Sequence, residues 1–367
     1  MAHVACGAGP RAETVAVKTP DVLVIGGGVV GLAVAWQLAR LGARVSLVEM
    51  EGTCGTHASG RNAAIFRSVD GMPETPLLAA HSRKLLASLG LPDAIRMVGL
   101  AQQAGPEIAH AGEPLGPGGV QKRLPFLAHL QLGFRWFPQD GVLDIHRVIT
   151  ALVTELRHLG VPIHLGRAVR LVRQGARVTV IGQAREELPA GMVVLAAGAW
   201  SGAVAAGAGL GLPITPLGRQ LTHFTAVPGL HAAHPVVWLN GNRELYFRPE
   251  SGGVLASGCE ESAAAPGEQA CNAEATHALA VRLLALSPAF AGAAVRHSWT
   301  CQRTFAPDRA LVVGPDPRAN NLVWATALGG RGMTCGLAVG EMVARSMTSN
   351  ARLPDAWAPA RLLGAAG

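Results

Sequence analysis

The chain has 367 residues, of which 49% are hydrophobic and 15% charged, and its formal net charge is +7. The length predicts two domains, and the composition excludes a disordered polyampholyte and, because the 46 glycines have no every-third-residue spacing, a collagen. The positive charges are scattered singly instead of forming runs, so we expect no nucleic-acid partner.

The N-terminal residues 1–20 are predicted to form a loose tail, since they lack the apolar segment that follows a basic start in a secretory signal. The next stretch, 22–39, carries no charge and approaches the length of a membrane span, but its three consecutive glycines favour a different structure. We therefore expect no transmembrane segment.

A dinucleotide-binding unit is predicted near the start of the chain. The apolar run 21–25 is typical of a buried parallel strand and leads into Gly26, Gly28 and Gly31, which form the motif G-x-G-x-x-G. The first glycine permits a tight turn, the second lets the backbone approach a pyrophosphate, and the third lets helix and strand pack closely. A helix over 32–39 then holds the phosphates at its N-terminus.

A second strand, over 44–48, ends at Glu49. A carboxylate in this position accepts hydrogen bonds from both ribose hydroxyls and repels a 2′-phosphate, which disfavours NADP. NAD and FAD both contain the adenosine diphosphate that the unit accepts, so the unit alone leaves that choice open. A glycine-rich helix-packing site or a membrane span is the alternative interpretation of the motif.

The central part of the chain mixes helices, strands and one long predicted loop. Apolar residues at helical spacing predict helices over 73–89 and 145–159, and the Gly/Pro-rich segment 101–119 is predicted to be a loop. Short apolar runs predict strands over 161–165, 169–172, 178–181 and 192–196.

The last part of the chain predicts a sheet and then a second strand–turn–helix unit. Alternation over 214–260 indicates an antiparallel sheet, followed by a helix near 272–286 and a strand near 295–303. A strand over 322–327, a glycine turn over 328–334 and a helix over 336–347 come next. We expect the N-terminus of this helix to point at a ligand.

Together these elements predict an α/β fold in which a discontinuous Rossmann-like domain carries an inserted antiparallel-sheet domain. We assign residues 20–75, 140–213 and 304–350 to the dinucleotide-binding domain, 76–139 and 214–303 to a substrate domain, and 1–19 and 351–367 to tails.

The six cysteines form no C-x-x-C pair and the 13 histidines show no metal-ligand spacing, so we expect no bound metal. Cysteines this dispersed are typical of a reducing compartment, and we expect a cytoplasmic protein.

Over roughly residues 20–350 the chain resembles the D-amino-acid oxidase superfamily of FAD-dependent oxidoreductases, most of all its D-arginine dehydrogenase, glycine oxidase and sarcosine oxidase branches. The resemblance lies in the motif 24–31 through Glu49, the loop 57–64, the segment 196–200 and the turn 329–334. It implies FAD as the cofactor. The residues that it implies for FAD binding are Gly26, Gly28, Val29, Val30, Gly31, Glu49, Met50, Ser59, Gly60, Arg61, Asn62, Ala63, Val169, Ala197, Gly198, Trp200, Gly329, Gly330, Arg331, Gly332, Met333 and Thr334.

The resemblance also implies how these residues lie against the cofactor. Residues 59–63 pass along the flavin, the backbone of Val169 meets the adenine, and residues 329–334 cover the pyrimidine end. A helix beginning near Gly332 supplies free N–H groups and partial positive charge, which stabilise the negative charge of reduced flavin.

Four residues are candidates for binding a substrate carboxylate. The resemblance implies this role for Arg303 and Tyr246, with Arg219 and Arg67 as weaker matches. An arginine suits it because two parallel N–H groups fit one carboxylate.

Three positions qualify the resemblance. Ile65 stands where D-arginine dehydrogenase has a histidine, and Asp70 stands at the position of its lid tyrosine, which speaks against a preference for arginine as substrate. Cys301 aligns with the cysteine that carries covalent flavin in monomeric sarcosine oxidases; a small apolar core residue is the other interpretation.

The expected reaction is oxidation of the Cα–N bond of a D-amino acid or a glycine-like amino acid. Hydride passes from Cα to flavin N5, and the imino acid hydrolyses to a 2-oxo acid. Bulk water takes the amine proton, so no catalytic base is assigned, and oxygen or a quinone reoxidises the flavin.

Three other functions stay open at this point. The first is an FAD-dependent 2-hydroxy acid dehydrogenase of the L-2-hydroxyglutarate type, whose flavin loop has a pattern like Gly60-Arg61-Asn62. The second is an oxidase of N-methyl amino acids of the sarcosine type. The third is a degenerate flavoprotein that serves as an assembly partner in a larger amine-oxidising complex.

Overall fold

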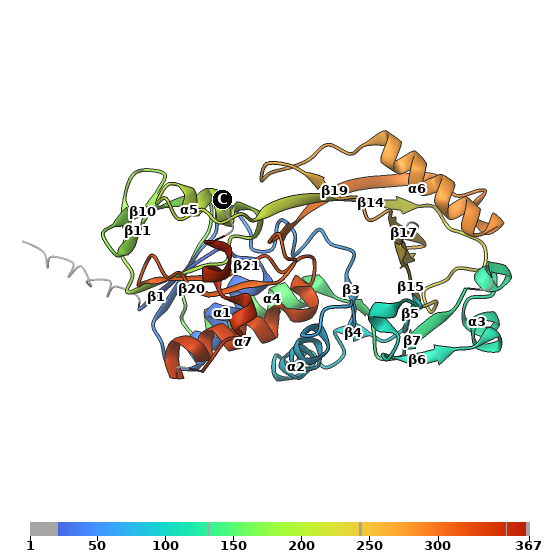
Figure 1. Cartoon of the computed structure of the whole chain (residues 1–367), viewed down its shortest axis with the longest axis horizontal. Helices are drawn as coiled ribbons and strands as arrows, with labels where there is room; N and C mark the ends of the chain where they lie inside the picture. Colours follow the sequence, from blue (N-terminus) through green and yellow to red (C-terminus); the bar gives the residue numbers. More distant parts are fainter. Residues whose placement is uncertain (1–20, 131, 242–243, 350, 365–367) are drawn as a thin grey trace, which may run out of the picture.

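The computed structural model describes residues 21–130, 132–241, 244–349 and 351–364. A six-stranded sheet in the order β20-β21-β13-β1-β2-β9 forms one end of the molecule, and all its neighbouring strands are parallel except β20 and β21 (Figure 1). Its strands are β1 (Val22–Ile25), β2 (Val45–Val48), β9 (Ile163–His164), β13 (Met192–Leu195), β20 (Val312–Pro315) and β21 (Leu322–Thr326).

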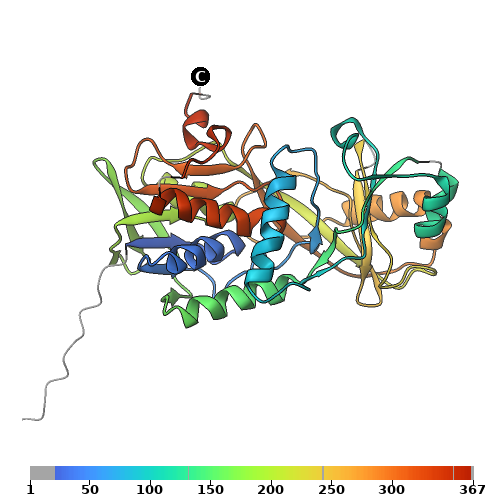
Figure 2. The same cartoon turned by 90° about the horizontal axis from the view of Figure 1, so that it is seen from below.

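Hydrophobic cores cover both faces of this sheet, which is why β1 is apolar throughout. Val22 and Val24 belong to one core, and Leu23 and Ile25 belong to the other. The first core is shared with the helices α1 (Val29–Arg40), α2 (Thr75–Ser88), α4 (Ile145–His158) and α7 (Gly332–Ser349). Figure 2 shows α1, α4 and α7 side by side on that face.

The second core is shared with a small antiparallel sheet and one short helix. These elements are β10 (Val169–Gln174), β11 (Arg177–Gly182), β12 (Glu187–Leu188) and α5 (Ser201–Ala206). The predicted Rossmann-like unit is thus confirmed as a parallel sheet with cores on both faces.

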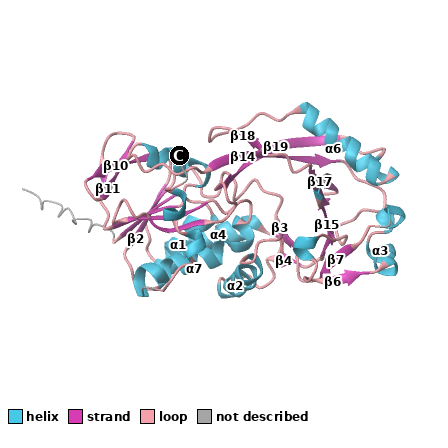
Figure 3. Cartoon of the chain, in the orientation of Figure 1, coloured by secondary structure: helices cyan, strands magenta, loops and turns pink. Residues whose placement is uncertain are grey.

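A nine-stranded sheet forms the other end of the molecule (Figure 3). Its order is β18-β14-β17-β16-β15-β5-β7-β6, with β19 beside β14, and only the β5–β15 pair is parallel. The strands are β5 (Leu100–Gln103), β6 (Glu113–Leu115), β7 (Phe134–Phe137), β14 (Thr215–Phe224), β15 (Val236–Leu239), β16 (Leu245–Glu250), β17 (Gly253–Ser257), β18 (Ser262–Ala263) and β19 (Val295–Phe305).

One face of this sheet packs against two helices, and the other contacts the loop that follows β2. The helices are α3 (Pro117–Arg123) and α6 (Ala273–Leu286), which share a core with Phe247 of β16. On the other face Tyr246 belongs to a cluster that includes Ala63 from the loop after β2. Directly after that loop the chain enters a three-stranded sheet in the order β3-β8-β4. Its strands are β3 (Ile65–Phe66), β4 (Ile95–Arg96) and β8 (Gly141–Leu143).

Three segments differ from the sequence-based expectations. Residues 101–119, predicted to be a loop, contain most of β5 together with β6 and the start of α3. The helix α2, which we assigned to the substrate domain, packs against α7 and shares the core on one face of the six-stranded sheet. The C-terminal segment, predicted to be a tail from residue 351, forms 3-10 helices at Asp355–Trp357 and Pro359–Leu362, with Trp357 and Leu362 buried. The predicted tail 1–19 lies outside the described residues.

Within the described ranges no helix is long and apolar enough to cross a membrane. The same ranges bring together no group of three or more His, Cys, Asp or Glu side chains that could hold a metal ion.

Candidate active site

A cavity of about 460 Å³ lies between the two large sheets and is lined by residues from both. The residues predicted for FAD binding that line it are Gly26, Gly28, Val29, Val30, Glu49, Met50, Ser59, Arg61, Asn62, Ala63, Val169, Ala197, Gly198, Trp200, Gly329, Gly330, Arg331, Gly332, Met333 and Thr334. Arg67, Arg219, Tyr246 and Arg303, predicted for carboxylate binding, line the same cavity. The fold therefore brings both predicted sets together.

Two of the glycines predicted for FAD binding, Gly31 and Gly60, do not line the cavity. At each of them the backbone of another residue lies where a Cβ would be. A Cβ at Gly31 would overlap the carbonyl oxygen of Gly26, so only glycine lets α1 approach the end of β1 this closely. A Cβ at Gly60 would overlap the carbonyl oxygen of Gly55 in the same way. Both residues shape the cavity through packing.

The turn after β1 is joined to the end of β2 through the buried carboxylate of Glu49. Its Oε2 accepts a hydrogen bond from the backbone N–H of Gly27 at 2.5 Å, and its Oε1 accepts one from Glu51 at 2.9 Å. Each oxygen keeps a second lone pair, and Glu49 lines the cavity. The carboxylate is therefore held in place to accept hydroxyl donors.

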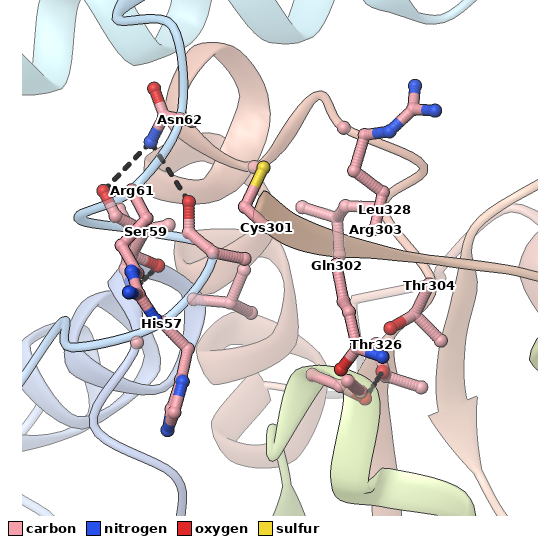
Figure 4. Close-up of a pocket in the computed structure, with 18 of the residues that line it drawn as sticks. His57, Ser59, Arg61, Asn62, Cys301, Gln302, Arg303, Thr304, Thr326 and Leu328 are labelled. Carbon is pink, nitrogen blue, oxygen red and sulfur yellow. Dashed lines mark hydrogen bonds between the residues drawn. The ribbon is translucent and has the colours of Figure 1, made fainter. Parts of the chain in front are cut away.

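The loop after β2 is held along the cavity by short polar side chains (Figure 4). The Oγ of Ser59 accepts a hydrogen bond from the backbone N–H of Val29 at 3.0 Å, which ties the loop to the first turn of α1. The Nδ2 of Asn62 donates to the carbonyl oxygens of Ala58 and Ser59 at 3.0 and 2.9 Å, and its Oδ1 accepts from Ala64 at 2.7 Å. These bonds support the left-handed backbone of Ala64, whose φ is 56°.

The N-terminus of α7 lies at the cavity, which Gly332, Met333 and Thr334 line. Gly329 and Gly330 have φ angles of 61° and 90°, which glycine adopts without strain, and α7 begins at Gly332. The Nε of Arg331 donates to the carbonyl oxygen of Leu328 at 3.0 Å and stabilises this turn. The free N–H groups and partial positive charge of the helix thus face the ligand space.

Arg219, Arg303 and Tyr246 lie on one face of the nine-stranded sheet. Arg219 of β14 pairs with Cys301 of β19, and Arg303 follows two residues later, so the three side chains share a side. Tyr246 of β16 lies opposite Trp238 of β15, and their rings stack at 4.6 Å between centroids. The register of the sheet therefore gathers these groups.

Burial and charged neighbours set the state of Arg303 and Tyr246. The Nη2 of Arg303 donates to Oε1 of Glu261 at 3.2 Å, and Glu261 also binds Arg309 at 2.7 Å. Burial and the charge of Arg219 lower the pKa of Arg303. Burial raises the pKa of Tyr246 to about 12, so its phenol keeps the proton and is a hydrogen-bond donor at neutral pH.

Arg67 reaches the same face from the segment after β3. Its Cζ lies 4.0 Å from the centroid of the Trp238 ring, and its Nε donates to the carbonyl oxygen of Val69 at 3.0 Å and to Oε1 of Gln102 at 3.1 Å. Gln102 is buried on β5, directly beside Trp238 in the parallel pair. Burial lowers the pKa of Arg67.

The other positions singled out in the sequence also line the cavity. Cys301 is buried, and burial raises the pKa of its thiol. Asp70 lies with its Oδ2 3.8 Å from Nε of Arg331, and Ile65 packs with the apolar cluster around Tyr246. Figure 4 shows Cys301 close to the loop that carries Asn62.

The sequence-based prediction missed Trp238, Glu244 and Glu261 in the cavity wall and Gln102 behind it. Period-two spacing from Tyr246 places Glu244 on the cavity-facing side and was a usable signal. No local signal marks Gln102, because its strand lies at the edge of a Gly/Pro-rich segment.

Comparisons with known proteins show the family to which the chain belongs. The family model described as DAO, FAD dependent oxidoreductase, matches residues 21–346. The chain is 27% identical over 325 residues to a glycine oxidase of Pseudomonas aeruginosa, which covers 82% of this chain and 87% of that protein. It is 26% identical over 324 residues to the bifunctional protein ThiO/ThiG of Synechocystis, covering 84% of this chain, and it spans only 48% of that relative's length.

The fold is also similar to solved structures. The crystal structure of L-proline dehydrogenase from P. horikoshii superposes with a TM-score of 0.83 at 20% identity, covering 94% of this chain and 97% of that one.

Proposed function

The chain belongs to the DAO family of FAD-dependent oxidoreductases and is an enzyme that uses FAD, and on this premise we propose that it oxidises the Cα–N bond of an amino acid. The product is an imino acid, which water hydrolyses to a 2-oxo acid and ammonia. A D-amino acid or a glycine-like amino acid is the substrate class we propose.

The residues around the cavity fit FAD. The glycine turn after β1 leaves room for phosphates at the N-terminus of α1, and Glu49 presents its lone pairs to ribose hydroxyls. The loop held by Asn62 and the N-terminus of α7 line the same cavity as the glycine turn. FAD accepts the hydride that leaves the substrate's Cα.

The observation that carries the proposal is that two arginines and a tyrosine, side chains able to bind a carboxylate, line the same cavity as the dinucleotide motif. Arg303 and Arg219 share one side of the sheet with Tyr246, and the buried Nε atoms of both arginines have no hydrogen-bond partner within the part of the chain that the structure describes. Buried donors of this kind call for an acceptor such as a carboxylate. Held there by its carboxylate, a substrate has its Cα oriented in the cavity.

The amine must lose its proton before the Cα–N bond is oxidised, and we assign this proton to bulk water. His57 is the single histidine among the described residues of the cavity wall, and its Nε2 lies 2.7 Å from Oε1 of Glu51 with its ring beside Trp200. A 2-hydroxy acid substrate needs a base for its hydroxyl proton, so the engagement of His57 favours the amino acid over the hydroxy acid.

The test is the visible spectrum of the FAD-loaded enzyme without oxygen, before and after addition of separate pools of D-amino acids, N-methyl amino acids and 2-hydroxy acids. Bleaching of the flavin band by an amino pool supports the proposal, and the pool that bleaches it separates primary from N-methylated amines. Bleaching by hydroxy acids alone overturns it. A fully loaded flavin that no pool reduces supports the non-catalytic alternative.

Two further points belong to this proposal. We propose oxygen or a quinone as the acceptor of the electrons, which the rate of reoxidation by each distinguishes. We place the enzyme in the cytoplasm because its cysteines are dispersed, and the five described ones are free thiols.

A further inference from the structure

Arg67 and Arg219 lie at the two ends of a stack of aromatic rings in the cavity wall. The Cζ of Arg67 is 4.0 Å from the centroid of Trp238, whose ring is 4.6 Å from that of Tyr246 at an interplanar angle of 25°. The Cζ of Arg219 is 6.0 Å from the centroid of Tyr246. The cavity wall therefore offers two guanidinium groups separated by an aromatic platform.

The guanidinium of Arg67 is oriented from behind. Its Nε is used by Val69 and by Gln102, a buried side chain, whereas neither terminal nitrogen makes a hydrogen bond with a described residue. Stacking on Trp238 fixes the plane of the group. Arg67 lines the cavity and keeps the donors of both terminal nitrogens, which suit a carboxylate bound through two parallel bonds.

Neither arginine forms a direct ion pair with an acidic side chain of the described residues. Within the described ranges neither Arg67 nor Arg219 has a carboxylate oxygen within 4.0 Å, whereas Arg303 has Glu261. Arg219 makes one hydrogen bond, from Nη2 to the carbonyl oxygen of Cys259 at 3.1 Å. Arg219 is buried and Arg67 is half-buried, and neither has a carboxylate in contact, so both positions favour an anion from the ligand.

A third charge completes the pattern. Glu244 lines the cavity, and its negative charge acts on both Arg67 and Arg219. Two cations and one anion are complementary to a ligand that carries two carboxylates and one ammonium group.

We propose that the substrate is an amino dicarboxylate whose second carboxylate binds Arg67; this inference rests on the function proposed above. The class includes acidic amino acids and N-carboxymethyl amino acids. The first carboxylate binds on the Arg219 side of the aromatic stack, and the amine lies toward Glu244. A neutral side chain leaves the guanidinium of Arg67 without an anion in contact and is selected against.

The experiment uses the FAD-loaded enzyme and pairs of compounds that differ in one charge. Glutamate is compared with glutamine and aspartate with asparagine, each as both stereoisomers, and iminodiacetate with sarcosine. We expect the rate constant of anaerobic flavin reduction, divided by the half-saturating concentration, to be about 10- to 100-fold higher for the acid of the preferred pair. In Arg67→Met we expect the preference for the acid over its amide to fall towards one. The control Arg345→Met, on the exposed side of α7, keeps the preference.

A second readout does not depend on turnover. Glutarate and succinate carry two carboxylates but no amine, and butyrate carries one carboxylate, so their binding is followed as a change in the flavin spectrum. We expect glutarate or succinate to bind about 10-fold or more tightly than butyrate, and Arg67→Met to remove the difference.

The outcomes separate this inference from the proposed function. If the amides reduce the flavin as efficiently as the acids, the second carboxylate site is wrong and the amino acid oxidation stands. If the diacids bind with the expected preference but no amino compound reduces the flavin, the site stands and the proposed reaction is wrong. Equal binding of diacids and butyrate together with no reduction overturns both.

Discussion

The carboxylate of Glu49 accepts a hydrogen bond from the backbone N–H of Gly27 at 2.5 Å, which joins the end of β2 to the glycine turn after β1. Two residues 22 positions apart thus form one element of the cofactor site. The acid stabilises the turn even before it meets a ribose.

Glu49→Gln tests this double role. The amide of the variant has an NH₂ group in place of one carboxylate oxygen, so one of the hydrogen bonds from Gly27 and Glu51 is lost. The variant also lacks a charged acceptor for the ribose. We expect the Kd for FAD to rise about 10- to 100-fold, which corresponds to the loss of a hydrogen bond to a charged group. Flavin fluorescence released on dilution measures it. Glu155→Gln on α4 is the control, and an unchanged Kd in Glu49→Gln contradicts the assignment.

Gly31→Ala tests the close contact between α1 and β1. A Cβ at this position overlaps the carbonyl oxygen of Gly26, and we expect a loss of about 1–3 kcal/mol or more in the free energy of unfolding. Gly118→Ala is the matched control, because Gly118 also lies in a helix but has nothing within 4 Å of an added Cβ. Urea unfolding followed by circular dichroism measures both, and equal stabilities disprove the packing argument.

Tyr246→Phe removes one hydroxyl and keeps the ring that stacks on Trp238. If the phenol binds the substrate carboxylate, kcat/KM falls about 5- to 30-fold while FAD content stays the same. Since the pKa of Tyr246 is raised to about 12, the phenol is protonated throughout pH 6–10, and the ratio of wild-type to variant kcat/KM stays constant there. A ratio that changes across this range shows that another group is responsible.

Asp140 makes stability depend on pH. Burial raises the pKa of its carboxyl to about 6, although Ser68 donates to Oδ2 through both its backbone N–H and its hydroxyl. Because the folded pKa exceeds the unfolded value, the folded state binds the proton more tightly, and stability from this group is lost as the pH rises from about 4 to about 6.

The variant Asp140→Asn has no proton to lose at this position. We expect it to gain stability relative to the wild type as the pH rises through this window, by about 3 kcal/mol at pH 7, and to differ least below pH 4. Chemical denaturation at a series of pH values measures the difference, with the exposed Asp355→Asn as control. A difference that is the same at pH 4 and pH 7 contradicts the assignment to Asp140.

The thiol of Cys301 decides whether the flavin is covalently bound. Burial raises its pKa, so it stays a neutral thiol, the less nucleophilic form. We expect acid precipitation of the yellow enzyme to release all of the flavin into the supernatant, in wild type and Cys301→Ser alike. Flavin that stays with the wild-type precipitate and is released from Cys301→Ser demonstrates a covalent bond.

Local patterns in the sequence were enough to predict the first strand–helix–strand unit and its acid. The strand β1 is apolar at every position because both of its faces are buried, Gly26 has a φ of 110° that favours glycine, and Gly31 packs against the carbonyl oxygen of Gly26, five residues earlier. Such features depend on neighbours along the chain, so they can be read without the rest of the fold.

The second sheet was harder to predict because its strands depend on distant partners. β5 is a short strand beside a Gly/Pro-rich segment, and it is held by β7 and by its parallel partner β15. Nothing within that segment indicates this pairing. Gln102 consequently went unnoticed, although it orients Arg67 from 35 positions away.

The sequence by itself determined which residue types could serve the site, namely a glycine motif, an acid after the second strand, and several arginines and a tyrosine capable of holding a carboxylate. The residues alone did not show which arginines converge, because an arginine has the same local appearance on a surface and in a cavity; only the family resemblance named Arg303, Arg219 and Arg67. The tertiary structure decided this through the register of β14 and β19, which puts Arg219 beside Cys301 and Arg303 two residues away, and through the stack that joins Arg67 to Trp238. A one-residue shift in that register would turn the same side chains to the opposite face of the sheet.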